Sequence, residues 1–281
     1  MLTKLKGGRV YDPANGVDGV LRDIYVRDGR IVGADPTAKV DAEIDVTGRI
    51  VMAGAIDPHT HIGGGKMTIA RTMLPEDHRG REHHRTDILR SGTGFAVPST
   101  MAAGYRYAEM GYTACFEPAM LPANARQAHM EMGDTPMVDK GAFAMLGSDD
   151  FLLRQMAARE DFEAIKDYIA WTMHAAQAIA VKVVNPGGIS AFKFNQRMLD
   201  LDESHVHYGV SPRQILRTLS KGLKELGVTH PLHVHGCNLG VPGNLGTTLA
   251  TIEAMDGLPI HLTHIQFHSY GTEGDNKFSS G

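Results

Sequence analysis

The sequence predicts an α/β protein: a small β-sandwich-like domain over residues 1–50, followed over residues 51–281 by about six strands of a (β/α)8 TIM-like barrel. Three observations favour this fold class. Short strands and tight turns fill the first fifty residues. After residue 50, apolar strands alternate with helical segments, which is the pattern of a parallel sheet. Histidines follow three of these strands, and (β/α)8 barrels gather their active sites at the carboxyl ends of their strands.

The composition excludes several classes of protein. The chain has 281 residues, 42% of them hydrophobic, and a net charge of −4, so it lacks the basic excess of a nucleic-acid-binding surface. No apolar run approaches the roughly 20 residues that span a bilayer, and the N-terminal MLTKLKGGRVYDP does not have the pattern of a signal peptide. Two cysteines, Cys115 and Cys237, exclude a disulfide framework and a cysteine-ligated iron–sulfur cluster within this chain. We therefore expect a cytoplasmic protein that binds neither nucleic acid nor membrane.

The first fifty residues contain two hairpin signals. LRDIYVRDGRIVGA alternates around Asp28-Gly29, a dipeptide typical of two-residue hairpin turns. EIDVTGRIVMAG offers a second candidate hairpin around Thr47-Gly48. No helical period is convincing before residue 50, so this segment is predicted to be a small β domain.

From residue 50 onward the sequence predicts six strands and four helices. The strands are expected at 49–57, 113–118, 142–147, 178–185, 231–236 and 260–265. The helices are expected at 99–111, 161–177, 211–227 and 247–255. The clearest helix starts with Ser211 as N-cap and Pro212 at its first position, and Gly227 stands at its C-terminal cap.

An open sheet and an incomplete barrel both fit six parallel strands. No GxGxxG motif follows the first strand, so the dinucleotide-binding open sheet has no support. Three strand ends instead carry histidine pairs. These pairs are His59 and His61, His233 and His235, and His261 and His264. The barrel explains these histidines, and we prefer it to the open sheet.

The stretch DPHTHI, residues 57–62, directly follows the first of these strands. Residues two apart on a strand point to the same side, so His59 and His61 are expected to aim at one point. Two converging imidazoles can begin a metal site. Two ordinary polar residues entering a loop are an equally good interpretation of this short motif by itself.

A β-rich segment before the first strand, HxH after it, Lys182 on the fourth strand and histidines on the fifth and sixth together resemble the amidohydrolase superfamily. The longer strings GYRYAEMGYT, KVVNPGGI, LHVHGCNLGVPGN and THIQFHSYG resemble the A-subunit family of formylmethanofuran dehydrogenase. They resemble still more its bacterial counterpart, the alpha subunit of the formyltransferase/hydrolase complex of methylotrophs. The resemblance extends over essentially the whole chain.

The resemblance implies a binuclear zinc site. His59 and His61 would bind the first Zn²⁺, His235 and His264 the second, and a carbamylated Lys182 would bridge the two. It also implies hydrolysis of the formamide of a formyl-methanofuran-type C1 carrier, which gives formate and the free carrier amine. The chain would do this as one component of a complex with other subunits.

Several neighbouring residues need an interpretation of their own. His233 shares the strand face of His235, and the register of VHGCNLG favours His235 as the ligand. His261 lies three residues before His264, so we expect it to face the helices. Asn185, Asn238 and His268 are candidates for contacts to the ligands or to the substrate.

Two lysines and one charged cluster can also be interpreted as ordinary surface residues without a functional role. Most lysines lie on the surface, but Lys182 is flanked by Val181 and Val183 in an apolar strand, where a buried unpaired ammonium would be costly. Lys193 lies outside that strand and is expected to be ordinary. HRGREHHR (78–85) is expected to be a solvated loop rather than a metal tract, with a contact to an acidic arm of the carrier as a weaker hypothesis.

The chain departs from the family pattern at its end. The resemblance implies a catalytic aspartate on an eighth strand, and the sequence stops at Gly281 after the sixth, so we expect that aspartate beyond this chain. Three other functions stay open: the reverse condensation in a formylmethanofuran dehydrogenase, a cyclic amidase of the dihydropyrimidinase or dihydroorotase kind, and a non-catalytic scaffold.

Overall fold

The structure, a computed structural model, describes residues 1–35, 37–65, 67, 69, 73, 86–88, 100–189, 199–276 and 278–281. Its contacts divide the chain into two compact units, Met1–Ala55 and Ile56–Gly281. The expected domain boundary at residue 50 falls at the first residue of a strand that pairs inside the first unit.

The first unit is a five-stranded sheet. Its strands are β1 (Leu2–Asp12), β2 (Val17–Arg27), β3 (Arg30–Val32), β4 (Ala42–Asp45) and β5 (Ile50–Met52). They run in the order β3-β2-β1-β4, and β5 also pairs with β1. The hairpin at Asp28-Gly29 is confirmed: both residues have positive φ, +50° and +77°, and β2 pairs with β3 in antiparallel fashion across them.

The second expected hairpin, around Thr47-Gly48, is wrong. Strands β4 and β5 do not fold back on one another, because both pair with β1 in parallel, one after the other along its length. Two glycines of β1 make room for this. A Cβ on Gly7 would lie 2.6 Å from the Thr47 hydroxyl, and a Cβ on Gly8 would lie 2.6 Å from Val51 Cγ2. The turn therefore carries the chain forward along β1 instead of reversing it.

The second unit is built on a six-stranded sheet. Its strands are β6 (Ala55–Asp57), β7 (Tyr112–Met120), β8 (Asp139–Met145), β9 (Ala180–Val184), β10 (Leu232–His235) and β11 (Ile260–Leu262). They lie in sequence order, and the pairs from β7 to β11 are parallel. This is the half-barrel arrangement that the sequence predicts. The segment 49–57 is not one barrel strand as expected, since it supplies β5 to the first unit and β6 to this sheet.

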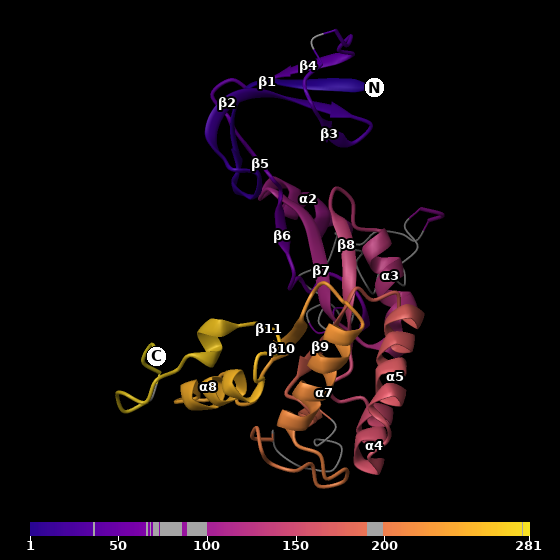
Figure 1. Cartoon of the computed structure of the whole chain (residues 1–281), viewed down its shortest axis with the longest axis vertical. Coiled ribbons are helices and arrows are strands. Elements are labelled where there is room, and N and C mark those ends of the chain that lie inside the picture. The colour runs from indigo at the N-terminus through magenta and orange to yellow at the C-terminus, as the bar shows by residue number, and fades with distance from the viewer. Residues whose placement is uncertain are drawn as a thin grey trace. The chain divides into compact units, whose positions relative to one another are not determined.

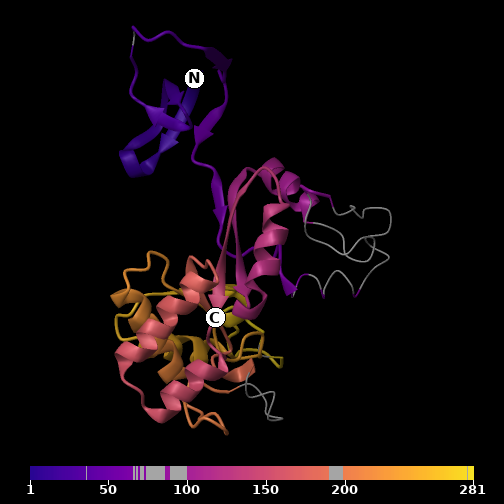
Figure 2. The ribbon, with the colours of Figure 1, turned by 90° about the vertical axis from the view of Figure 1, so that its right-hand side faces the viewer.

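Helices connect the parallel strands (Figures 1 and 2). They are α2 (Met101–Glu109), α3 (Ala125–Gly133), α4 (Asp150–Ala158), α5 (Phe162–Ala175), α7 (Pro212–Glu225) and α8 (Leu245–Ala254). The four expected helices are present, and α3 and α4 are additional. A full capping box starts α7: the Ser211 side chain accepts from the Gln214 N–H, and the Gln214 side chain accepts from the Ser211 N–H. No helix of the described part is long and apolar enough to cross a membrane.

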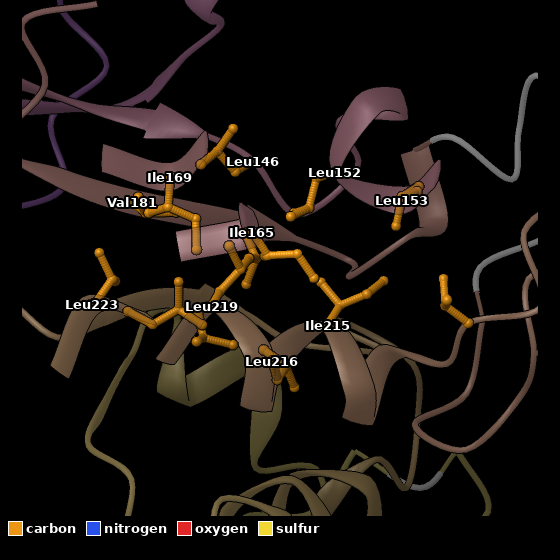
Figure 3. Close-up of a cluster of buried hydrophobic side chains, with 14 of the residues drawn as sticks. Leu146, Leu152, Leu153, Ile165, Ile169, Val181, Ile215, Leu216, Leu219 and Leu223 are labelled. Atoms are coloured by element: carbon orange, nitrogen blue, oxygen red, sulfur yellow. The ribbon is translucent and has the colours of Figure 1, made fainter. Parts of the chain in front are cut away.

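The main core fills the space between the sheet and the helices α4, α5 and α7. Figure 3 shows Ile165 and Ile169 of α5 facing Ile215 and Leu219 of α7, with Val181 of β9 on the same cluster. Fully buried aliphatic side chains pack here, and this packing holds β9 and β10 against the helices. The side chains on the other face of these strands are thereby held in place.

Candidate metal centre

The structure brings four of the predicted ligands together at the carboxyl ends of their strands. His59 and His61 follow β6, His235 ends β10, and His264 follows β11. The ring centroid of His59 lies 5.1 Å from that of His61 and 4.4 Å from that of His264. The ring centroids of His235 and His264 are 5.3 Å apart. Four imidazoles from three strands therefore share one region of the half-barrel.

His59 has the properties of a metal ligand. Burial, followed by the charge of Lys182, lowers its pKa to about 3, so the ring is neutral and keeps a lone pair. Its Nδ1 lies 2.9 Å from Nε2 of His233. Its Nε2 is buried without a hydrogen-bond partner. A buried polar atom of this kind costs free energy unless something binds it, and a cation next to Nε2 would satisfy it.

His61 is oriented by a carboxylate that the sequence analysis did not identify. Its Nδ1 lies 3.0 Å from Oε1 of Glu117, a residue of β7 that is only 1% exposed. A ring that donates Nδ1–H to a carboxylate presents the lone pair of Nε2, which is the common arrangement of a metal-binding histidine. The side chain of His61 is 43% exposed, so it borders open space.

Glu117 also holds the loop that follows DPHTHI. Its Oε2 accepts from the N–H groups of Ile62 and Gly63 at 3.0 and 3.4 Å, and its Oε1 accepts from the N–H of Ala119 at 3.0 Å. One carboxylate thus fixes both the ring and the backbone beside it. The signal for it in the sequence is an acidic residue at the end of the apolar strand TACFEP, where a charge needs a partner.

Lys182 is buried, with 1% of its surface exposed, in the middle of β9. Val181 and Val183 on either side are fully buried in the helix-facing core, so Lys182 faces the other way. Its Nζ donates a long hydrogen bond of 3.4 Å to the hydroxyl of Thr263. The charge of Lys182 adds to burial in lowering the pKa of His264, so the two groups act on the same site.

Three predicted site residues share an unusual backbone conformation. Asn185, Asn238 and His264 follow β9, β10 and β11, and their φ angles are +40°, +55° and +54°. Among residues with a side chain, Asn, Asp and His enter this left-handed region most readily. Such residues cluster at functional sites, where the surrounding structure holds them in place.

The three candidates for outer contacts differ in position. The buried Oδ1 of Asn185 has no hydrogen-bond partner. The side-chain amide nitrogen of Asn238 donates to Asp200 and to Thr247, so its donors are already used. His268, 1% exposed, accepts the Gly236 N–H at Nε2 over 3.2 Å, and its ring lies 6.2 Å from that of His235. Burial is the main cause that lowers its pKa to about 4.

The expectation that His261 faces the helices is wrong. It pairs with His233 across β10 and β11, and the two rings stack at 4.7 Å with 7° between their planes. Side chains alternate between the two faces of a sheet only within a strand. β11 ends at Leu262, and His264 has a left-handed backbone conformation, so the alternation does not relate His261 to His264. His230 joins this pair, and the three rings offer nitrogens within 4.8 Å of one another.

The four predicted histidine ligands offer a donor set that suits a divalent metal ion. Four imidazole donors converge there, one of them with an orphaned buried nitrogen, and zinc prefers such nitrogen donors. A second histidine cluster is made by His233 of β10, His261 of β11 and His230, which precedes β10. The segment 78–85 and Lys193 lie outside the described residues.

Known proteins resemble this chain over most of its length. The amidohydrolase family matches residues 42–279. The chain is 41% identical to protein FwdA of Methanocaldococcus jannaschii, with 98% of this chain and 50% of that protein covered. It is 40% identical to the FhcA subunit of the formyltransferase/hydrolase complex Fhc of Methylorubrum extorquens, with 100% of this chain and 50% of that protein covered.

The structural comparison agrees with the comparison of sequences. The crystal structure of the Methylorubrum extorquens complex FhcABCD with methylofuran matches with a TM-score of 0.87 at 41% identity, over 98% of this chain and 49% of that chain. The chain spans about half the length of the curated relatives it matches. By its fold, its strand-end histidines and these matches, the chain belongs to the amidohydrolase family.

Proposed function

We propose that this chain carries the metal centre of a hydrolase that cleaves the formamide of a formyl-methanofuran-type C1 carrier. Water adds to the formyl carbon, the C–N bond breaks, and formate and the free carrier amine result. The chain would work as one component of a cytoplasmic formyltransferase/hydrolase complex. The observation that carries this proposal is the convergence of His59, His61, His235 and His264, in a chain 40% identical throughout to the FhcA subunit.

The relatives support the choice of substrate class. The matched crystal structure is that of a formyltransferase/hydrolase complex bound to methylofuran. A furan-type carrier that reaches this chain would meet the exposed His61 side of the site. The same similarity supports other subunits of such a complex as the partners of this chain.

The proposed site would take two Zn²⁺ ions. His59 and His61 would hold one, His235 and His264 would hold the other, and Lys182, if carbamylated on Nζ, would supply a ligand shared by both. Zinc, when bound, activates water and polarises a carbonyl oxygen. Four neutral imidazoles leave the charge of two dications uncompensated, and a carbamate on the buried Lys182 supplies one negative charge there. Glu117 keeps His61 in the tautomer that binds, and the packed β9 and β10 exclude water from the side of the helices.

A second candidate is the reverse reaction, in which formate and the carrier amine condense. The observation in its favour is the 41% identity to FwdA over 98% of this chain. The same site serves both directions, because a catalyst accelerates both equally. A redox partner that produces formate would favour condensation, and a formyltransferase partner would favour hydrolysis.

The test of this function uses the complete polypeptide in its complex. We expect it to release formate from an N-formyl furfurylamine-type substrate, to leave a cyclic ureide intact, and to contain two zinc ions. Turnover of the cyclic ureide alone would instead show a cyclic amidase. Absence of bound metal and of all amide hydrolysis would show a scaffold.

The test of the bridging lysine is Lys182→Ala. We expect loss of zinc and of activity, because the bridge is gone, and partial recovery of both with excess short-chain carboxylic acids. The control is Lys140→Ala, since Lys140 donates to the carbonyl of Thr135 outside the site. An unmodified Lys182 ammonium that points away from the metals in a zinc-loaded crystal structure would refute the bridge.

A further inference from the structure

Three histidines form a hydrogen-bonded row that starts at the metal centre. Nδ1 of His59 lies 2.9 Å from Nε2 of His233, and Nδ1 of His233 lies 3.1 Å from Nε2 of His230. His59 and His233 are 174 residues apart in sequence, and β7, β8 and β9 separate their strands in the described sheet. Each contact joins the Nδ1 of one ring to the Nε2 of the next, so the row has a direction.

We propose that His233 is a positioning residue that holds His59 in its metal-binding tautomer, with His230 as the second link. This inference rests on the proposed function, in which His59 binds zinc. The argument needs one chemical fact: a neutral imidazole carries its proton on one nitrogen and a lone pair on the other.

The direction of the row follows from the free nitrogen of His59. Its Nε2 is the atom without a partner, so this nitrogen gives its lone pair to the metal and the proton is on Nδ1. Nδ1–H then donates to Nε2 of His233, which must be an acceptor. His233 therefore carries its own proton on Nδ1 and donates it to Nε2 of His230. Each ring fixes the tautomer of the ring before it.

The packing around His233 holds its ring in place. The residue is completely buried. His261 stacks on one side of the ring, and Phe143 lies 4.9 Å away at 63° to it. A ring that cannot turn presents a fixed acceptor to His59, and such partners are what orient metal-binding histidines.

The same cluster also has the geometry of a separate metal site. His230, His233 and His261 bring three ring nitrogens within 4.8 Å of one another. The row of hydrogen bonds argues against this alternative, because Nδ1 of His233 carries a proton whenever His59 binds zinc. A protonated nitrogen has no lone pair for a metal. The two interpretations therefore predict different metal contents.

His61 and His59 thus have different supports. His61 donates to a carboxylate, Glu117, whereas His59 donates to a neutral imidazole. A hydrogen bond to a neutral acceptor is weaker than one to a carboxylate, and it adds no charge to the interior of the half-barrel. The loss of His233 is consequently felt through the orientation of His59 and not through a change in charge.

The experiment compares a matched pair of substitutions in the complete polypeptide. His233 and His261 face each other in register, so His233→Leu and His261→Leu remove the same volume and polarity from adjacent strands. Zinc affinity is measured by competition with a chromophoric chelator, and the visible spectrum is recorded after substitution with cobalt. We expect His233→Leu to weaken zinc binding about 10–100-fold, the usual effect of losing such a partner, and to shift the cobalt spectrum. In His261→Leu an apolar side chain still packs against the His233 ring and the hydrogen bond to His59 is retained, so zinc binding should stay within about twofold of the wild type.

A third variant tests rescue. In His233→Gln the side-chain oxygen reaches the position of Nε2 and can accept from His59, so zinc affinity should return to within about threefold of the wild type. If His233→Leu does not fold, His230→Leu, at a half-buried position, should still weaken zinc binding, though by less.

Distinct outcomes separate the possible failures. Wild-type zinc affinity in His233→Leu, with His59 on the metal, would overturn the positioning role and leave the proposed function intact. Full zinc content in His59→Ala would overturn the proposed site itself. Loss of one further metal ion from both His233→Leu and His261→Leu would show that the histidine cluster is a metal site of its own.

Discussion

Glu117→Gln is the sharpest test of how DPHTHI is held, because Glu117 accepts two hydrogen bonds on each oxygen. On one side are His61 and Ala119, and on the other are Ile62 and Gly63. An amide has one oxygen and one NH2 group. If the NH2 group faces Ile62 and Gly63, two backbone N–H groups lose their acceptor. If it faces His61, the Ala119 N–H alone loses its acceptor, and His61 can adapt by changing its tautomer.

The second orientation is therefore favoured, and it places the proton of His61 on Nε2, the nitrogen that would face the metal in the proposed centre. One hydrogen bond to a charged acceptor is worth about 1.5–3 kcal/mol, so the free energy of unfolding of the metal-free protein should fall by about that amount. Zinc affinity should fall about 10–100-fold, as for other lost partners of a metal-binding histidine. Urea unfolding and chelator competition measure the two effects separately.

Glu131→Gln is the matched control. Glu131 is also buried and accepts from the same loop, at the Gly64 N–H over 2.7 Å, but it has no described contact to a histidine of the site. We expect Glu131→Gln to reduce stability modestly and to leave zinc affinity unchanged. Equal losses of zinc affinity in the two variants, or no loss in Glu117→Gln, would refute the tautomer argument.

Three further predictions concern the stability of the metal-free chain. Gly147→Ala should lower the free energy of unfolding by about 1–3 kcal/mol, because its Cβ would lie 2.6 Å from Val183 Cβ; an unchanged melting temperature would contradict this. Ser211→Ala should cost about 1 kcal/mol through loss of the N-cap of α7, while Ser211→Asp, which can still cap, should cost much less in the same unfolding assay. Stability should fall as the pH drops from 6.5 towards 4, because buried histidines with lowered folded pKa values, among them His268 at about 4 and His59 at about 3, take up protons first in the unfolded chain; His268→Gln should make the pH dependence of the urea midpoints less steep.

The sequence predicts the strands of the half-barrel well because their signal is local. An apolar run such as AIAVKVVN and a capping pattern such as that at Ser211 report directly on their own segment. The same is true of the hairpin at Asp28-Gly29, where both residues adopt the positive φ that the turn requires. The placement of Lys182 in a buried strand also follows from its immediate neighbours.

The parts that the sequence does not predict depend on distant partners. Thr47-Gly48 is compatible with a reversal and with a step forward, and only the pairing of β4 and β5 with β1 decides between them. The contact between His59 and His233 joins the end of β6 to β10, which no local pattern relates. The role of Glu117 cannot be predicted from its own segment either, because its partners lie in the loop after β6.

The left-handed backbone conformation of His264 limits which residue types can replace it. An exchange of metal specificity usually begins with an exchange of ligands, and here the backbone restricts the choices. Aspartate enters the φ near +54° that this position requires, and it would supply an oxygen donor. Glutamate and cysteine would have to adopt a conformation that costs about 1–3 kcal/mol without the compensation that a short polar side chain finds. Within the proposed metal centre, aspartate is therefore the replacement at position 264 that keeps a donor atom with the least backbone strain.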